Sequence, residues 1–243
     1  MNRNAKFWLL FFGLTFGVLA AVVLAVEIGP VPIPYDMVVR IVLSKLLPNA
    51  VAVDWTSVQE QIVWVFRLPR ALLAVLVGAA LSVSGTALQA LVRNPLADPY
   101  TFGISNGASV GAVLVITLGA GVATGFSLSG AAFIGALITM VIVYGIAQQG
   151  GQVSPGRLIL AGVAISYALS AITTYLVLRA SSPGTNSAAI ALSWLAGTLG
   201  AAKWEQLGIP GITVFATTIL LMLQSRRNQR TARQAIEQRS ASA

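Results

Sequence analysis

Hydrophobic and polar residues are distributed along this chain in long blocks. Six blocks of 17 to 22 residues are mostly apolar and contain no Asp, Glu, Lys or Arg. They are Phe7–Val26, Ala71–Ala90, Phe102–Ala120, Phe126–Ala147, Leu158–Leu178 and Leu207–Leu223. About 20 apolar residues in a helix cross the ~30 Å hydrocarbon layer of a bilayer, and these blocks lack the polar face that a helix keeps in a soluble protein. The pattern predicts an all-α fold, a polytopic helical membrane protein with about six transmembrane helices surrounded by lipid.

Two of the connections between these blocks contain further apolar segments. The first connection, Glu27–Phe66, starts with prolines that break regular structure. From Asp54 onward its apolar residues recur at helical spacing, so we expect an interfacial helix capped by Asp54. The segment Ser187–Ala202 is too short for a span, and we expect a re-entrant or surface helix there.

The charges outside the blocks predict the orientation of the chain. The net charge is +8. With the amino terminus inside, the inner segments hold nine Lys and Arg against two acids, and the outer segments hold six against five. Because cationic residues gather on the cytoplasmic side, we expect both termini in the cytoplasm of a cell that carries the chain in its inner or plasma membrane. Residues 1–223 then form the membrane domain and residues 224–243 a basic cytoplasmic tail. The positive charge is therefore explained without nucleic acid.

The composition excludes most chemistry. The chain contains no Cys and no His, which removes thiol nucleophiles, His-ligated metals and the usual neutral-pH base. No catalytic, cofactor-binding or metal-binding set can be assembled, so an enzyme is not expected. No Walker-type phosphate loop is present, and the blocks hold no carboxylate for a proton or sodium relay. We therefore expect any transport energy to come from another polypeptide.

Small residues recur at four-residue spacing in two of the blocks. Gly103, Gly107 and Gly111 share one face of the third block, and Gly78 and Ser82 share one face of the second. Because close backbone approach drives helix association in lipid, we interpret these five positions as helix-packing sites rather than as a phosphate cradle.

Two arginines stand at the predicted outer end of the second block, in the sequence Arg67-Leu68-Pro69-Arg70. Long cationic side chains at such positions commonly extend to the lipid headgroups. Arginine also forms two-pronged contacts with carboxylates, so the pair could receive an acidic partner protein. Physical reasoning alone favours the first interpretation and leaves the second open.

The same arginines begin a run that is recognisable as a whole. From Arg67 to Ala112 the sequence reads RLPRALLAVLVGAALSVSGTALQALVRNPLADPYTFGISNGASVGA, and further matching residues lie at Ser154–Ala164 and near Trp194, Gly197 and Trp204. Together they resemble the FecCD-type permeases, the membrane subunits of ABC importers for iron–siderophore, haem and cobalamin. The resemblance extends over roughly residues 7–223.

The resemblance implies a fold, partners and site residues. The fold would be the amino-terminal portion of a ten-helix permease. The partners would be a second permease copy in a homodimer or heterodimer, a cytoplasmic ATPase subunit and an extracytoplasmic substrate-binding protein. The implied sites are binding-protein docking at Arg67 and Arg70, an inner gate at Ser154, Pro155 and Gly156, and an inner turn on the ATPase side at Arg93, Asn94 and Pro95. The implied function is import of an iron–siderophore or a related metal chelate such as cobalamin or haem.

The sequence departs from this family after Leu223. The segment Ser225–Arg239 is basic and rich in Gln, and it does not match the family's ATPase-coupling segment. The later spans have no counterpart either. We therefore expect a chain truncated at its carboxyl end, and an alternative stays open: a non-transporting membrane interaction protein or remnant of such a permease. A split permease completed by a second polypeptide is the other alternative.

Overall fold

The computed structural model describes residues 2–47, 52–95, 97–118, 127–181, 186–200 and 202–241, with side chains as far as Ser225. Some predicted features lie outside these residues. They are Leu96 of the Asn-Pro-Leu-Ala run, the end of the third block at 119–120, the start of the fourth at Phe126, and the side chains of the basic tail beyond residue 225.

Within the described residues, five helices are long and apolar enough to cross a membrane. They are α1 (Arg3–Glu27), the run of α3, η1 and α4 (Ser57–Gln61, Ile62–Arg67 and Leu68–Val92), α7 (Leu128–Ala147), α8 (Pro155–Arg179), and η3 (Trp204–Gln206) with the first part of α10 (Gly208–Ala241). A sixth apolar helix, α5 (Ile104–Leu118), has 15 residues, which is about 22 Å at 1.5 Å per residue. The predicted all-α membrane fold is confirmed.

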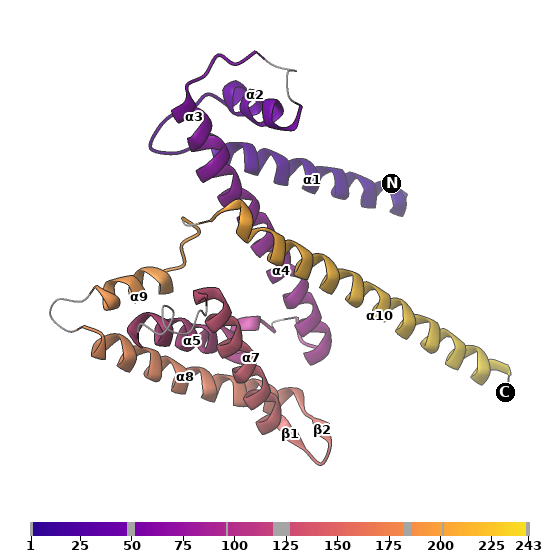
Figure 1. Ribbon diagram of the computed structural model, residues 1–243. Coiled ribbons are helices and arrows are strands. Elements are labelled where there is room, and N and C mark those ends of the chain that lie inside the picture. The colour runs from indigo at the N-terminus through magenta and orange to yellow at the C-terminus, as the bar shows by residue number, and fades with distance from the viewer. Residues whose placement is uncertain are drawn as a thin grey trace. The chain divides into compact units, whose positions relative to one another are not determined.

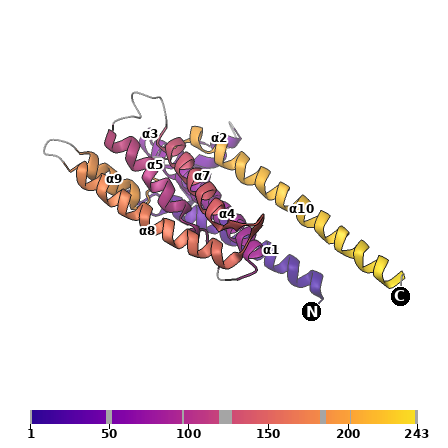
Figure 2. The ribbon, with the colours of Figure 1, turned by 90° about the horizontal axis from the view of Figure 1, so that it is seen from below.

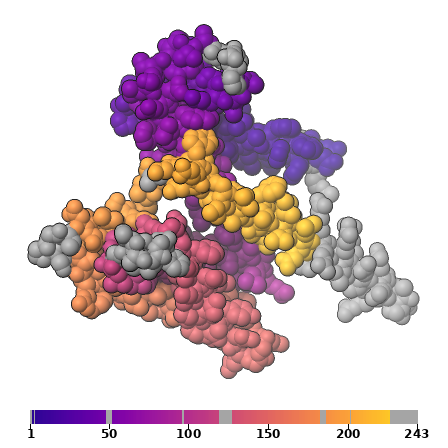
Figure 3. Space-filling model, viewed as in Figure 1, coloured from indigo at the N-terminus to yellow at the C-terminus, as the bar shows by residue number. Residues whose placement is uncertain are grey.

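The chain forms two compact units, Met1–Ala80 with Leu199–Ala243, and Leu81–Thr198. In the first unit, α2 (Tyr35–Leu46) begins directly after Pro34 and packs against α1 and η1 (Figures 1 and 3). The core of this unit contains Val26, Ile33, Ile41 and Val63. The sequence did not predict α2.

Polar contacts fasten the segment that carries α2 and α3. Arg40 pairs with Asp36 at 2.9 Å and also with Asp54. The hydrogen bond to Asp54 raises the pKa of Arg40 above its ordinary value. The predicted cap at Asp54 is wrong, because α3 is capped by Thr56, whose hydroxyl accepts from the Gln59 amide at 3.3 Å in a capping box.

The second unit is a helical layer built around α5. This helix packs against both α7 and α8, and α9 (Ser187–Leu195) contacts α5 and α8 (Figures 1 and 2). Nine residues long, α9 is a short helix within the segment expected to be re-entrant or superficial. One cluster of the core joins Val113, Val177 and Ala191 from α5, α8 and α9.

The helices leave most of their apolar surface uncovered by the rest of the chain. Only 6% of the apolar stretch of α1 and none of that of α10 is buried. Water would make this exposure unfavourable, whereas lipid tails would not. This exposed apolar surface agrees with the prediction from the composition that the chain lies in a bilayer.

Candidate functional site

The Arg67-Leu68-Pro69-Arg70 segment sits where a π-helix joins α4. In η1 the hydrogen bonds run to the fifth preceding residue, as from the Leu68 amide to the Val63 carbonyl. The π-helix ends at Arg67, and the helix continues through Pro69. π-Helical turns are rare and occur often at functional positions.

The two arginines of this segment have different surroundings. Arg67 is half-buried, and its Nη1 donates to the carbonyls of Val26 at 2.8 Å and Glu27 at 2.9 Å. Its Nη2 donates to the carbonyl of Val31 at 2.6 Å. Arg70 is exposed, and among the described residues it has no hydrogen-bond or ion-pair partner. The two arginines therefore differ both in exposure and in their hydrogen bonds.

A second contact reaches the same π-helix from η3, the short helix before α10. The indole of Trp204 donates to the carbonyl of Trp64 at 2.8 Å, and the two ring centroids lie 4.8 Å apart. In the π register this carbonyl would accept from residue 69, and Pro69 has no N–H to give. Trp204 thus supplies the donor that proline removes. The sequence marked Trp204 only as a family match.

The predicted inner turn begins with a helix cap of an uncommon kind. Arg93 has a left-handed backbone with φ of 53°, and the Asn94 amide donates to the Gln89 carbonyl at 3.2 Å. This is the Schellman pattern that ends α4, with arginine where glycine is usual. Pro95 follows, and Arg93 is exposed.

The predicted gate residues follow a hairpin that the sequence analysis missed. Strands β1 (Gln148–Gln149) and β2 (Gln152–Val153) pair antiparallel around a two-residue turn. Gly150 and Gly151 have φ of 59° and 78°, as a type I′ turn requires. The two adjacent glycines in the sequence could have indicated this hairpin turn.

The three residues predicted as a gate form the start of α8. Ser154 is the extended residue before the helix and accepts from the Leu158 amide at 3.0 Å. Pro155 is the first helical residue, where its missing N–H is harmless, and Gly156 follows it. Arg157 donates to the Gln149 side chain, so the hairpin and the helix start are linked.

The residues of the predicted inner turn and those of the predicted gate lie at the same end of the second unit. One buried cluster contains Val92 and Ala97 from either side of the turn, Ala147 before the hairpin and Leu158 after the gate, together with Phe102. The structure therefore brings together two residue sets that the sequence separated by about 60 positions.

Two small residues of the third block, Gly107 and Gly111, lie where α5 packs closely against α7. A Cβ added to Gly107 would lie 2.6 Å from the Gly135 carbonyl oxygen and clash with the Thr139 hydroxyl. A Cβ added to Gly111 would clash with the Ala131 carbonyl. The same limit holds on the α7 side of the contact, because a Cβ added to Gly135 would clash with the Gly107 carbonyl.

The other predicted packing positions differ. Gly103 has φ of 72°, and its added Cβ would lie 2.9 Å from the Ser166 hydroxyl of α8. An added Cβ at Gly78 would meet nothing within 4 Å among the described residues. Ser82 accepts from the Thr86 hydroxyl at 2.7 Å within α4. The shared spacing therefore corresponds to three different environments.

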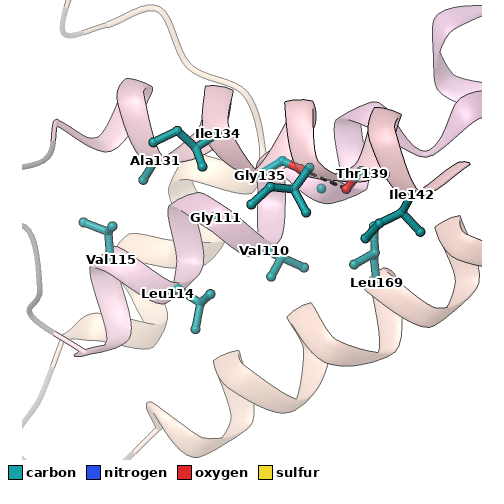
Figure 4. A pocket seen from close by; sticks show the side chains of 12 residues that line it. Val110, Gly111, Leu114, Val115, Ala131, Ile134, Gly135, Thr139, Ile142 and Leu169 are labelled. Carbon is teal, nitrogen blue, oxygen red and sulfur yellow. Dashed lines mark hydrogen bonds between the residues drawn. The ribbon is translucent and has the colours of Figure 1, made fainter. Parts of the chain in front are cut away.

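Beside the contact of α5 and α7 lies an apolar groove of about 460 Å³ (Figure 4). Its lining residues are Gly107, Val110, Gly111, Leu114, Val115, Ala131, Ile134, Gly135, Ile138, Thr139, Ile142 and Leu169. Its one hydroxyl, on Thr139, donates to the Gly135 carbonyl at 2.9 Å. The described residues contain no group of three acidic, His or Cys side chains that could hold a metal. The groove thus offers apolar contact and no chelating chemistry.

These features define a class, a polytopic helical membrane protein with structured turns at the ends of its helices. The FecCD transport family matches residues 17–232, most of the chain, and the chain belongs to this family. The resemblance found in the sequence is confirmed.

Individual relatives carry more specific names. The chain is 37% identical over 207 residues to the vitamin B12 import system permease protein BtuC of Klebsiella pneumoniae, covering 85% of this chain and 55% of that protein. It is 40% identical over 163 residues to the cobalamin import system permease protein BtuC of Halobacterium salinarum, covering 66% of this chain and 42% of that one. The chain spans about half the length of these relatives.

A solved structure is also similar. It is assigned to the metal-chelate type of ABC transporter in an inward-facing conformation. The match has a TM-score of 0.66 and 28% sequence identity, and covers 88% of this chain and 61% of the other.

Proposed function

We propose that the chain is a permease subunit, or part of one, of an ATP-driven importer for a metal chelate. The family match over residues 17–232 carries this proposal. Cobalamin comes first among the chelates, because both similar relatives named above carry that substrate in their names. An iron–siderophore and haem are the other candidates from the sequence resemblance.

The proposed assembly follows the family. A second permease copy, identical or related, would complete the path, a cytoplasmic ATPase would supply the energy, and a substrate-binding protein would deliver the chelate from outside. Residues 1–223 would form the permease domain and residues 224–243 a basic cytoplasmic tail, with both termini in the cytoplasm. This orientation is supported by the excess of Lys and Arg in the predicted inner segments.

We assign different roles to the residues at the two ends of α4 (Leu68–Val92). Arg70, exposed and without a partner among the described residues, has the chemistry to receive a carboxylate of the binding protein. At the other end, the cluster that holds Val92, Ala97 and Leu158 fixes the inner turn beside the gate residues. We propose that the ATPase contacts the turn Arg93–Pro95 and that Ser154–Gly156 close the path.

The test is purification of the tagged chain from cross-linked membranes, followed by uptake measurements. We expect an ATP-binding-cassette subunit to be recovered with the chain, and the reversed-charge variant Arg93→Glu to recover less of it. Cells without their own family permeases, supplied with the chain and its recovered partners, should take up radiolabelled cyanocobalamin or a ferric siderophore. A stable, membrane-inserted chain that recovers no ATPase and supports neither uptake would contradict the proposal and favour a non-transporting interaction protein.

A further inference from the structure

One face of α2 is apolar and yet exposed. Tyr35, Val39, Leu43 and Leu46 recur at the spacing of residues that share one face of a helix. Their exposed fractions are 65, 41, 39 and 65%. A different side of the same helix places Ile41 in the core of the first unit. We call the four exposed residues the α2 stripe.

The three charged residues of α2 are all paired within the chain. Arg40 binds Asp36 at 2.9 Å and also binds Asp54, and Lys45 binds Glu60 at 2.5 Å. These ion pairs fasten α2 to the segment that leads into α3 and to α3 itself. The stripe carries no charge, so what it offers to a partner is apolar contact together with one phenol.

The connection from α1 shows which apolar partner lies within reach. Residues 28–34 read Ile-Gly-Pro-Val-Pro-Ile-Pro and contain no polar side chain. Ile28 and Val31 are exposed, so apolar surface continues from the end of α1 to Tyr35. α2 packs against α1, and only 6% of the apolar stretch of α1 is buried within the chain. The lipid that surrounds α1 is therefore the apolar phase next to the stripe.

We propose that α2 is an interfacial helix, and that its stripe lies at the boundary between headgroups and acyl chains in the leaflet that receives the carboxyl end of α1. Helices of this kind bury an apolar face about 5–10 Å deep. Tyr35 suits that depth, because its ring contacts lipid while its hydroxyl stays hydrated. Since α2 also packs against η1, the lipid contact fixes the helix that leads into α4. The contact requires only a chain in a membrane, whatever that chain transports.

Spin labels in lipid measure the depth of the stripe. The chain has no Cys, so single labels can be placed at Val39→Cys and Leu43→Cys in phosphatidylcholine nanodiscs that hold one chain each. Oxygen, which concentrates in lipid, and a nickel chelate, which stays in water, relax the label. Phe16→Cys in the middle of α1 is the lipid reference, and Val53→Cys is the water reference. We expect both stripe labels to show an oxygen-to-nickel ratio roughly threefold or more above that of Val53→Cys.

Two results with these labels would overturn the inference. Nickel accessibility at Val39 and Leu43 equal to that at Val53 would show that the stripe faces water. Low accessibility to both reagents would show that another part of the chain covers it. Adding phosphatidylglycerol should leave both ratios unchanged, because the stripe carries no charge. A high ratio that appears only with this anionic lipid would instead assign the contact to the cations of α2.

A charge placed within the stripe tests the contact by substitution. Val39→Glu, read by a label at Leu46→Cys, should raise the nickel accessibility of that label roughly threefold or more, because a carboxylate is unfavourable below the headgroups. Val53→Glu is the matched control, since it adds the same charge to the exposed loop and should leave the label at its parent value. Equal accessibility in all three proteins would contradict the lipid contact.

Crosslinking to lipid tests the chain without any substitution. Phosphatidylcholine with a diazirine near the ester end of its acyl chain should crosslink to peptides of both α1 and α2, as identified by mass spectrometry. A diazirine at the methyl end should crosslink to α1 but not to α2, because the stripe lies near the membrane surface. If α2 is absent from both sets of crosslinks, or present equally in both, the inference is wrong even where a substituted chain fails to fold.

Discussion

The contact between α5 and α7 sets a limit on residue size that Gly107→Ala tests. The new Cβ would lie 2.6 Å from the Gly135 carbonyl oxygen and 2.8 Å from the Thr139 Cβ, and it would clash with the Thr139 hydroxyl. The backbone oxygen cannot rotate away, so the helices must separate. Overpacking of this kind usually costs about 1–3 kcal/mol.

Gly145→Ala, in the same unit, is the matched control. An added Cβ there meets nothing within 4 Å in the part of the chain that the structure describes. Both substitutions gain the same helix preference of alanine over glycine, about 0.5–1 kcal/mol. Their difference therefore isolates the packing strain, and we expect Gly107→Ala to be less stable than Gly145→Ala by about 1–3 kcal/mol, or roughly 5- to 150-fold in the folding constant.

Steric trapping measures this difference. Because the chain has no native cysteine, two introduced cysteines on α7 and α8 can carry biotin, and streptavidin binding reports unfolding in a mild detergent. Thr139→Ala should partly restore Gly107→Ala, since it removes the hydroxyl but leaves the carbonyl in place. Stabilities of the two alanine variants within about 0.5 kcal/mol of each other would refute the reasoning.

Two further predictions concern the first unit and the orientation. Trp204→Phe removes the donor to the Trp64 carbonyl and should lower the free energy of unfolding by about 1–3 kcal/mol. Trp194→Phe, which breaks no hydrogen bond among the described residues, should lower it less. Thermal unfolding in detergent measures both losses, and equal losses would count against the contact between Trp204 and the π-helix. On intact cells, a membrane-impermeant maleimide should label Val53→Cys but not Tyr100→Cys. Both side chains are exposed, but Val53 is predicted on the outer side of the membrane and Tyr100 on the inner side. Labelling of Tyr100→Cys alone would show that the predicted orientation is reversed.

The helices themselves could be predicted because apolar blocks free of charge have few alternatives to a membrane helix. Their boundaries could not. The sequence suggested that the second span starts after Pro69, yet the helix begins at Ser57 and passes through it. The π-helical turn and the distant Trp204 make that continuity favourable, and neither is visible in local spacing. Likewise α5 begins only at Ile104, since Gly103 adopts a left-handed conformation.

The residues of the candidate site could be predicted from the sequence, but their contacts could not. Chemical type and family resemblance selected Arg67 and Arg70, but the contacts that distinguish them involve carbonyls some 40 residues away. Small-residue spacing selected Gly78 as readily as Gly107, although of these two it is Gly107 whose added Cβ would lie within 3 Å of a neighbouring backbone atom. Spacing along a helix determines which residues share a face, whereas the residue that covers the face depends on tertiary structure.

The segment that contains both arginines also satisfies backbone hydrogen bonds that the membrane would otherwise leave unpaired. Pro69 removes an N–H, and the Trp64 carbonyl that would have accepted it takes the Trp204 indole instead. Arg67 brings extra donors, which go to the end of α1 and its loop. These contacts pair carbonyls that the helices themselves leave without a donor, so Pro69 and Arg67 have structural roles that require no partner protein. Arg70 has no such contact among the described residues, so docking is best tested on that residue.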